Sequence, residues 1–370
     1  MGTFKVLGVL ALPPTQIIND ALAVKIAVNT RTLSQPMTGV QRYLISLLRH
    51  TPKDIGILKV LSKEKGIKGH LWEQLVLPCL TGKHLLWSPS NTGPLSVKNQ
   101  IVTIHDTVAL EHPEWFNPQF SAWYRFLIPR LAARVRCIIA VSQYTKYSIS
   151  DICKIPEDKI KVVLNGVDPK FTPRSQQQIR FTKKYLNIPG AKYVLALGTF
   201  EPRKNLDRLI RAWGHVVGSF PDDIWLVVAG AKGHRRIFAK MQKYSLTPRI
   251  FFCGFVPDEM LPALYSGAMV TAYPSLHEGF GLPALESLAC GCPVLTSNTT
   301  ALPEVVRNAA ILANPYDCEE IAYGLSKLVL NENLRIELSR LGLKRAMNLS
   351  WKRTASETFD ILKEEALAYS

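Results

Sequence analysis

Short apolar runs with strand character alternate with helical patterns along most of this sequence, and that alternation constrains the fold more than any other feature. Alternating strands and helices are typical of the α/β class, in which helices cover a parallel sheet. The strand-like runs are residues 25–29, 85–88, 100–104, 137–141, 193–198, 224–230, 250–254, 268–274 and 294–296.

The alternation stops after residue 168 and restarts near residue 193, which predicts two domains. The intervening segment is polar and basic and contains Pro169 and Pro173. A chain of 370 residues is also too long for one ordinary hydrophobic core. We therefore expect two Rossmann-like, doubly wound α/β domains that face a central cleft. The expected divisions are an N-terminal domain at 1–170, a linker at 171–190, a C-terminal domain at 191–350, and a last helix at 351–370 that crosses back onto the first domain.

Composition indicates the cellular location of the chain and the charge of its partners. Seven cysteines include no Cys-x-x-Cys pair, which favours reduced thiols and a cytoplasmic location. No apolar run approaches the roughly 20 residues of a membrane-spanning helix. The short run 4–12 is interpreted as a strand or a disordered lead-in rather than a signal peptide. The net charge of +16 predicts anionic partners, such as nucleotide diphosphates or acidic lipid headgroups, and no motif indicates nucleic acid.

Residues 277–286 place two carboxylates around a Gly-Phe-Gly turn, between a strand-like run and a helical pattern. Pro283 fits the first turn of that helix. The amides of residues 279–282 would then lie at a helix N-terminus, where phosphate binds. With Glu278 and Glu286 on either side, the segment suits a diphosphate that carries hydroxyls at both ends, as a nucleotide sugar does.

A second polar segment, residues 198–206, begins where a strand-like run ends in Gly198. Ligands of open α/β sheets bind at the carboxyl ends of strands, and Arg203 and Lys204 would lie there. Arginine offers bidentate hydrogen bonds to phosphate and lysine offers a compact charge. An exposed Arg-Lys pair alone would be an ordinary solvated helix start, but together with residues 277–286 it predicts a diphosphate site.

These segments resemble the retaining glycosyltransferases of family 4, the glycosyl transferases group 1, which have the GT-B fold. The resemblance rests on Gly-Thr-x-Glu-Pro-Arg-Lys-Asn at 198–205 and on two glutamates separated by seven residues, Glu278 and Glu286. It covers roughly residues 25–360. Further matches are His105-Asp106, Val141-Ser142 and Asn-Gly-Val-Asp at 165–168. It implies transfer of a hexose from a nucleotide sugar to a sugar or a lipid-linked acceptor, with retention, in polysaccharide or glycolipid biosynthesis.

The resemblance also implies a role for each matching position. Arg203 and Lys204 would stabilise the leaving diphosphate, and Glu278 would contact hydroxyls of the donor sugar. Glu286 would accept hydrogen bonds from the ribose, and His105 would touch the donor sugar or the transition state. The remaining donor-binding positions are Gly254 and Val256 beside the base and the amides of Gly279, Phe280, Gly281 and Leu282.

The N-terminal domain would bind the acceptor through the loop that contains Thr38, Gly39 and Arg42. Gly39 permits a ligand to approach the backbone closely. This loop departs modestly from the double glycine that is usual in the family. No Asp-x-Asp triplet occurs in the sequence, so we expect no cofactor and no metal, with Arg203 and Lys204 replacing a cation at the diphosphate.

Several alternatives remain open from the sequence. The same fold suits a nucleotide-sugar-binding protein without catalysis, and it also carries epimerases and phosphorylases. A UDP-hexose is the first candidate donor and GDP-mannose the second, and no residue decides between them. Residues 121–136 alternate arginines with apolar side chains, which suits either peripheral contact with an anionic membrane, at its inner face, or an ordinary domain helix.

Overall fold

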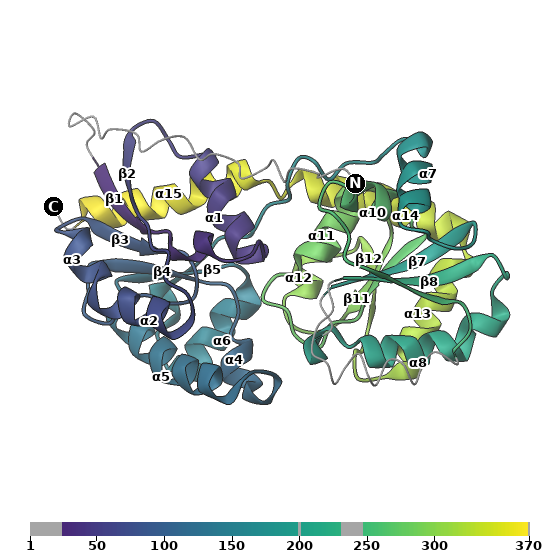
Figure 1. Ribbon diagram of the computed structural model, residues 1–370, viewed down its shortest axis with the longest axis horizontal. Coiled ribbons are helices and arrows are strands. Elements are labelled where there is room, and N and C mark those ends of the chain that lie inside the picture. The colour runs from purple at the N-terminus through teal and green to yellow at the C-terminus, as the bar shows by residue number, and fades with distance from the viewer. Residues whose placement is uncertain (1–23, 199–200, 231–246, 369–370) are drawn as a thin grey trace, which may run out of the picture.

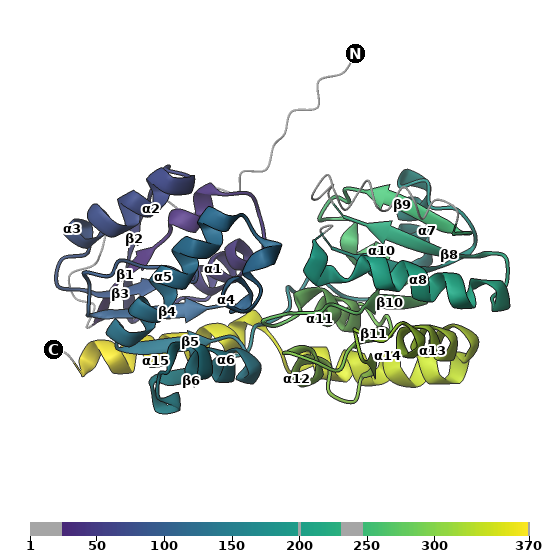
Figure 2. The same ribbon diagram turned by 90° about the horizontal axis from the view of Figure 1, so that it is seen from below.

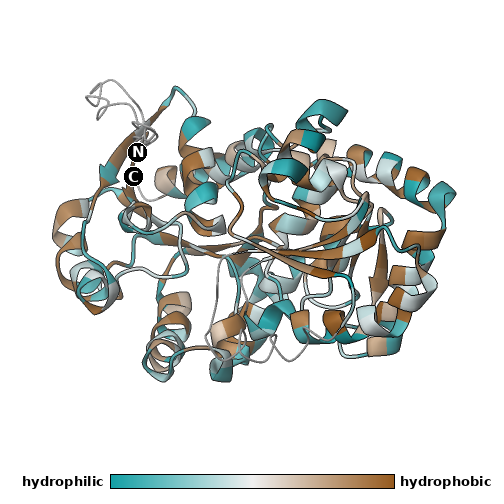
Figure 3. Cartoon of the chain, turned by 45° about the vertical axis from the view of Figure 1, so that its right-hand side comes forward, coloured by the Kyte–Doolittle hydropathy of each residue, from teal (hydrophilic) through white to brown (hydrophobic). Residues whose placement is uncertain are grey.

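In the computed structural model, residues 24–198, 201–230 and 247–368 are described, and they form two lobes, each built on a parallel six-stranded sheet (Figures 1 and 2). The run 4–12, Thr199 and Phe200 lie outside the described residues. The prediction of two doubly wound α/β domains is confirmed. Apolar strands occupy the middle of each lobe and polar residues gather on the outer helices (Figure 3).

The first sheet has the strand order β2-β1-β3-β4-β5-β6. Its strands are β1 (Val24–Asn29), β2 (Ile55–Val60), β3 (Leu85–Ser88), β4 (Gln100–Ile104), β5 (Cys137–Ala140) and β6 (Ile160–Val162). Its helices are η1 (Arg31–Ser34), α1 (Gly39–Arg49), α2 (Gly66–Leu75), α3 (Leu77–Thr81), α4 (Val108–Glu111), η2 (Pro113–Trp115), α5 (Pro118–Arg134), α6 (Gln143–Cys153) and η3 (Glu157–Lys159).

The second sheet has the order β12-β11-β10-β7-β8-β9, which is the Rossmann order of 3-2-1-4-5-6 when its strands are counted from β7. Its strands are β7 (Lys192–Leu197), β8 (Ile224–Ala229), β9 (Ile250–Gly254), β10 (Val270–Tyr273), β11 (Val294–Ser297) and β12 (Ala310–Ala313). The helices around it are α7 (Gln176–Tyr185), η4 (Pro202–Lys204), α8 (Leu206–Val216), η5 (Val217–Ser219), α10 (Leu261–Gly267), α11 (Leu282–Ala289), α12 (Leu302–Val306), α13 (Cys318–Leu330) and α14 (Glu332–Met347).

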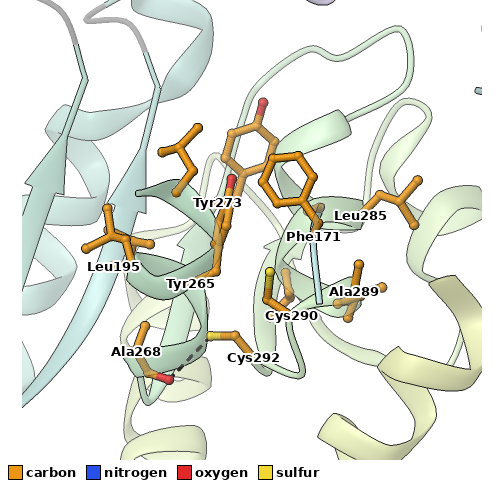
Figure 4. Packing of buried hydrophobic residues seen from close by; sticks show 14 of the residues in the cluster. Phe171, Leu195, Tyr265, Ala268, Tyr273, Leu285, Ala289, Cys290 and Cys292 are labelled. Carbon is orange, nitrogen blue, oxygen red and sulfur yellow. Dashed lines mark hydrogen bonds between the residues drawn. The ribbon is translucent and has the colours of Figure 1, made fainter. Parts of the chain in front are cut away.

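Each sheet is buried on both faces, because neighbouring residues of a strand enter different cores. Ile26 of β1 packs with α1 and the C-terminal helix, whereas Ala27 packs with Leu77 of α3 on the other face. In the second lobe, Leu195 of β7 belongs to the core that contains Phe171, Tyr265, Cys290 and Cys292 (Figure 4). Both thiols are 2% exposed, and every cysteine is free, which agrees with the prediction of reduced thiols.

The expected linker at 171–190 is largely built into the second lobe. It contains α7, which Ser175 and Gln178 start with a capping box. Phe171 and Leu186 lie in the hydrophobic core of that lobe. A polar, proline-containing stretch therefore encloses a short helix whose apolar side packs on the domain.

The chain crosses between the lobes a second time after α14. The last helix, α15 (Trp351–Leu367), lies along the first lobe, and Trp351 and Phe359 are buried in its core (Figure 1). The two crossings touch, because the amide of Val167 donates to the carbonyl of Leu349 at 3.0 Å. The C-terminal helix is thus a part of the first lobe that the chain adds last.

Candidate functional site

A cavity of about 360 Å³ lies between the lobes at the carboxyl ends of their strands. Open α/β sheets bind ligands where the strand order reverses, and in the second sheet that point lies between β7 and β10. The loop after β7 carries Arg203 and Lys204, and the loop after β10 carries Glu278. The topology therefore brings together two segments that lie more than 70 residues apart.

The cavity gathers nearly all of the residues that the sequence predicted. Gly254 and Val256 are not among its lining residues. Gly254 ends β9, and Val256 is buried in the hydrophobic core of the second lobe. The predicted residues that line the cavity are Thr38, Gly39, Arg42, His105, Arg203, Lys204, Glu278, Gly279, Phe280, Gly281, Leu282 and Glu286.

Two cations converge on the carboxylate of Glu278. The Lys204 ammonium lies 2.6 Å from Glu278 Oε1, and Arg203 Nη1 lies 3.3 Å from Glu278 Oε2. The hydroxyl of Tyr273, at the end of β10, donates to Glu278 Oε1 at 2.6 Å. Glu201 holds the other side of the guanidinium, 2.6 Å from Arg203 Nε. The carboxylate therefore fixes both cations at the wall of the cavity.

The charge state of this group follows from its surroundings. Burial opposes ionisation of Glu278, but Lys204 and Arg203 outweigh it and hold the pKa of the carboxyl below its usual range. Burial lowers the pKa of the Lys204 ammonium, and repulsion from Arg203 adds to that effect, while Glu278 opposes both. Glu278 is shared by both cations and Glu201 pairs with Arg203, so the four charges balance. A phosphate would therefore be attracted by the cations that lie nearest to it and by the N-terminus of α11.

Local sequence fixes the loop that carries the cations. Asn205 has a left-handed backbone with φ of 57°, which asparagine tolerates better than most residues. Its side-chain amide donates to the carbonyls of Pro274, at 2.9 Å, and Pro315, at 2.6 Å. The amide of Leu276 donates to the carbonyl of Arg203 at 2.7 Å. These bonds join the loops after β7 and β10 into one rigid wall.

The glycine turn brings the lobes into contact. A Cβ added to Gly279 would lie 1.8 Å from the carbonyl oxygen of His105, so only glycine fits there. The carbonyl of Gly279 accepts from Ser142 Oγ at 2.7 Å and from Thr145 Oγ1 at 3.1 Å, both in the first lobe. Gly281, with φ of 100°, then turns the chain into α11.

Helix α11 begins as the sequence predicted, with Pro283 in its first turn and Gly291 just beyond its end. Its N-terminus faces the cavity, because Gly279, Phe280, Gly281 and Leu282 all line it. Among the described residues, no hydrogen bond is found to the amides of these four. The positive end of the helix dipole and the amides offer an anion site beside Arg203 and Lys204.

His105 follows β4 on the opposite wall. Its Nε2 lies 2.7 Å from the carbonyl oxygen of Pro89, and since a carbonyl only accepts, Nε2 carries the proton. Burial lowers the pKa of the imidazole. The ring is also fixed edge-on against Tyr43, at 4.8 Å between centroids. His105 is therefore a neutral, oriented imidazole whose Nδ1 is an acceptor.

Glu286 lies about one turn into α11 and also lines the cavity. Burial raises the pKa of its carboxyl to about 7, although Arg42 and a hydrogen bond from Tyr265 act in the opposite direction. The Tyr265 hydroxyl donates to Oε2 at 3.1 Å, and Arg42 Nη1 lies 3.9 Å from Oε1. Arg42 also pairs with Asp258, so α1 of the first lobe contacts the second lobe directly.

A second set of contacts between the lobes lies next to Glu278. His277 Nε2 lies 3.1 Å from Glu111 Oε1, and Glu111 also accepts from Ser148 at 2.6 Å and from Tyr144 at 3.0 Å. Burial opposes ionisation of Glu111, but the hydrogen bonds from His277 and Ser148 lower the pKa of this carboxyl. Glu111 thus ties the segment that carries Glu278 to the first lobe.

Sequence reasoning missed several residues that build the site. The sequence predicts Tyr273 only as part of a buried strand, although a tyrosine at the carboxyl end of a strand can place its hydroxyl in a ligand site. Glu111 lies in a four-residue helix with no motif around it, and no local signal could have found it. Thr145 and Asp258 matter only through contacts distant in sequence.

The described part of the chain lacks two other features that could bear on function. No group of three or more His, Cys, Asp and Glu side chains there could hold a metal ion. No described helix combines the length and the apolar character needed to cross a bilayer.

Comparison with known families places the chain among sugar-transferring proteins. Residues 178–345 match the family described as glycosyl transferases group 1, and residues 84–171 match glycosyltransferase family 4. The O-antigen chain mannosyltransferase B of Escherichia coli is 28% identical over 282 residues, which are 76% of this chain and 74% of that protein. A serotype-specific mannosyltransferase WbdA of Escherichia coli is 30% identical over 268 residues, 70% of this chain but 33% of that protein.

A similar fold is found in the Anabaena protein HepE, solved in complex with UDP and glucose. The two structures superpose with a TM-score of 0.73 at 16% sequence identity. The superposition covers 92% of this chain and 99% of HepE. At this sequence identity the similarity concerns the fold alone. The superposition includes both lobes of this chain.

Proposed function

Since this chain belongs to the glycosyl transferases group 1 and has the GT-B fold, we propose that it transfers mannose from GDP-mannose to a saccharide or lipid-linked acceptor in polysaccharide synthesis. The observation that carries this proposal is the pair Arg203 and Lys204, which Glu278 fixes at the mouth of a helix N-terminus.

The choice of sugar rests on the relatives. Two of them are mannosyltransferases, one for O-antigen chains, which favours GDP-mannose over the UDP-hexose that ranked first from the sequence. HepE was solved with UDP, which keeps a UDP-hexose as the second candidate donor. A nucleotide-sugar-binding protein without catalysis remains the alternative, and the intact group around Glu278 argues against it.

The mechanism follows from the direction in which charge moves. Transfer builds positive charge at the anomeric carbon and negative charge on the leaving diphosphate, so stabilisation of that negative charge lowers the barrier most. Arg203, Lys204 and the amides of residues 279–282 surround the space where the diphosphate would lie. In this proposal they replace a metal ion, and Glu278 accepts from hydroxyls of the sugar while it keeps both cations in place.

The acceptor would approach from the first lobe, past Thr38 and Gly39. His105, as a neutral acceptor, would take a hydrogen bond from the donor sugar. We propose retention of configuration, with attack on the same face as the leaving phosphate, which takes the acceptor proton. Glu286 would accept hydrogen bonds from the ribose.

A thermal-shift screen tests the donor, because a ligand that binds the folded state raises the apparent melting temperature. GDP-mannose should raise it more than UDP-glucose or UDP-galactose at equal concentration. Release of GDP should then require an acceptor mannoside. Stabilisation by GDP-mannose without any acceptor-dependent release of GDP would favour the binding protein, and no stabilisation by any nucleotide sugar would refute the proposal.

A further inference from the structure

An apolar stripe covers the outer side of α2 and α3 on the first lobe. Ile67, Leu71 and Leu75 recur every four residues along α2, so they share one side of the helix, and they are 72%, 54% and 69% exposed. Val76 and Leu80 continue the stripe and are 42% and 49% exposed. We call these five residues the α2 face.

The inner side of α2 is fastened to the sheet, so the outward direction of the α2 face is fixed. Glu73 is fully buried and accepts from Asn29 Nδ2 at 2.7 Å, at the end of β1. Arg31 Nε lies 3.4 Å from the same carboxylate, and Thr92 donates to it at 3.1 Å. A buried ion pair of this kind costs several kcal/mol when one partner is removed, so the helix does not rotate freely.

The α2 face continues onto α5. Trp123 Nε1 donates to His70 Nδ1 of α2 at 3.2 Å, and Trp123 stacks on Phe126, which is 45% exposed. The guanidinium of Arg130 lies 4.0 Å above the Phe126 ring. The other apolar residues of α5 mostly face the core, among them Leu127 and Ile128. Residues 121–136 are therefore mainly a domain helix, and only this corner of it joins the exposed stripe.

Basic side chains border the α2 face. Lys63, Lys65 and Lys68 precede or lie on α2 and are exposed, and Glu64 is the acidic residue among them. Arg125 and Arg130 are exposed on α5. An apolar stripe with a cationic border matches the two parts of an anionic bilayer surface, the acyl boundary and the charged headgroups.

We propose that the α2 face docks on an anionic membrane surface and thereby presents the first lobe to a lipid-linked acceptor. The α2 face is linked to the site through η1. Glu73 of α2 pairs with Arg31, the first residue of η1. Gln41 Nε2 donates to the carbonyl of Thr32 in η1 at 3.2 Å. Gln41 belongs to the acceptor-side loop and helix. The acceptor class rests on the proposed function, whereas the docking surface rests on exposure and charge alone.

Co-sedimentation of the full chain with vesicles tests the docking. The wild type should bind vesicles of phosphatidylcholine with phosphatidylglycerol and not vesicles of phosphatidylcholine alone. The double variant Leu71→Glu/Leu75→Glu should bind the anionic vesicles about tenfold more weakly or worse. The matched control is Ile336→Glu on α14 of the other lobe, 62% exposed, which should bind like the wild type. Equal binding by the double variant and the wild type would overturn the proposal.

Two further measurements separate the explanations. If the α2 face instead joins two copies of this chain, the double variant will change the mass measured by light scattering and leave vesicle binding unchanged, which also overturns the proposal. The thermal shift with GDP-mannose reports on the donor site alone. Vesicle binding without any response to nucleotide sugars would therefore refute the proposed function and not the docking surface.

Discussion

The Lys204 ammonium lies 2.6 Å from the carboxylate of Glu278, across the point where the strand order of the second sheet reverses. The pair joins the ends of β7 and β10, and Tyr273 donates to the same carboxylate oxygen. The sequence predicted that both residues would face one ligand. The structure adds that they hold each other in position before any ligand is considered.

Lys204→Ala should remove most of the activity while the fold persists. In the wild type the ammonium would stabilise the leaving diphosphate. Removal of one such donor typically lowers kcat by a factor of about 10² to 10³. Acceptor-dependent GDP release measures the effect, and far-ultraviolet circular dichroism checks the fold. Lys192→Ala, an exposed lysine at the start of β7, serves as the control. Normal turnover in Lys204→Ala would show that the assigned role is wrong.

Gly279→Ala should impair sugar transfer strongly, although it adds only one methyl group. The new methyl carbon would lie 1.8 Å from the His105 carbonyl, so the two lobes must move apart. Gly218→Ala, in η5 of the second lobe, is the control, because a Cβ added there would meet no atom within 4 Å. We expect a loss of kcat of at least about tenfold for Gly279→Ala, since small misplacements are costly in catalysis. Similar activity of the two variants would contradict the closeness of the lobes.

Donor affinity should increase as the pH rises from 6 to 8. Glu286 has a pKa of about 7, so its ionised fraction rises from about a tenth to about nine tenths over this range. If the carboxylate binds the ribose, Kd for GDP-mannose should fall by up to about ninefold. Calorimetry at several pH values measures this change. In Glu286→Gln the pH dependence should be flat, and a profile as steep as that of the wild type would assign it to another group.

The raised pKa of Glu286 also predicts that the stability of the ligand-free protein depends on pH. Its folded pKa lies above the usual 4.5, so ionisation disfavours the folded state and stability falls as the pH rises from about 4.5 through about 7. Glu286→Gln removes this loss. The melting temperature of the variant relative to the wild type should therefore be higher at pH 8 than at pH 5, and an unchanged difference would contradict the raised pKa.

Glu111→Gln should loosen the contact between the lobes. Glu111 bridges His277 to the first lobe, and the lowered pKa of this carboxyl indicates that its ionised form is the one stabilised. We expect a higher KM for the acceptor and a wider lobe separation by small-angle X-ray scattering. Glu114→Gln, an exposed neighbour paired with His112, is the control. Scattering curves identical to those of the wild type would show that Glu111 does not hold the lobes together.

Activity should persist in the presence of a chelator. The proposal assigns the charge of the leaving diphosphate to Arg203, Lys204 and the amides of residues 279–282. GDP release measured with and without EDTA should therefore agree within about twofold, because an electrostatic role already filled by the protein leaves little for a cation to add. A strict requirement for manganese would contradict this assignment.

Sequence alone predicted the parts of the fold that depend on local patterns. Buried strands such as β7 and β8 are long apolar runs, and Pro283 and Gly291 mark the two ends of α11. Three strands were not expected, β2, β6 and β12, and each lies at a sheet edge. Strands β6 and β12 have only three and four residues, and Lys59 interrupts the apolar run of β2, so each gives a weak pattern in the sequence.

The same distinction between local patterns and distant contacts applies to the residues of the site. Residues in motifs, such as Arg203 and Glu278, could be assigned to strand ends from the sequence, and the structure brings them to one cavity. Partners such as Glu111 and Thr145 were not found, since their positions are set by how one lobe meets the other. Val256 was expected beside the base but packs in the core, because a valine after a strand satisfies either place.

The return of α15 to the first lobe has a consequence for how the protein is made. Trp351 and Phe359 complete a hydrophobic core that begins with Val24 and Ile26. That core can therefore close only after residues 351–362 have been synthesised, so the lobe that is made first completes its folding after the second lobe has been made. Until then one face of its sheet lacks the cover of α15, and apolar surface exposed in this way is prone to aggregation.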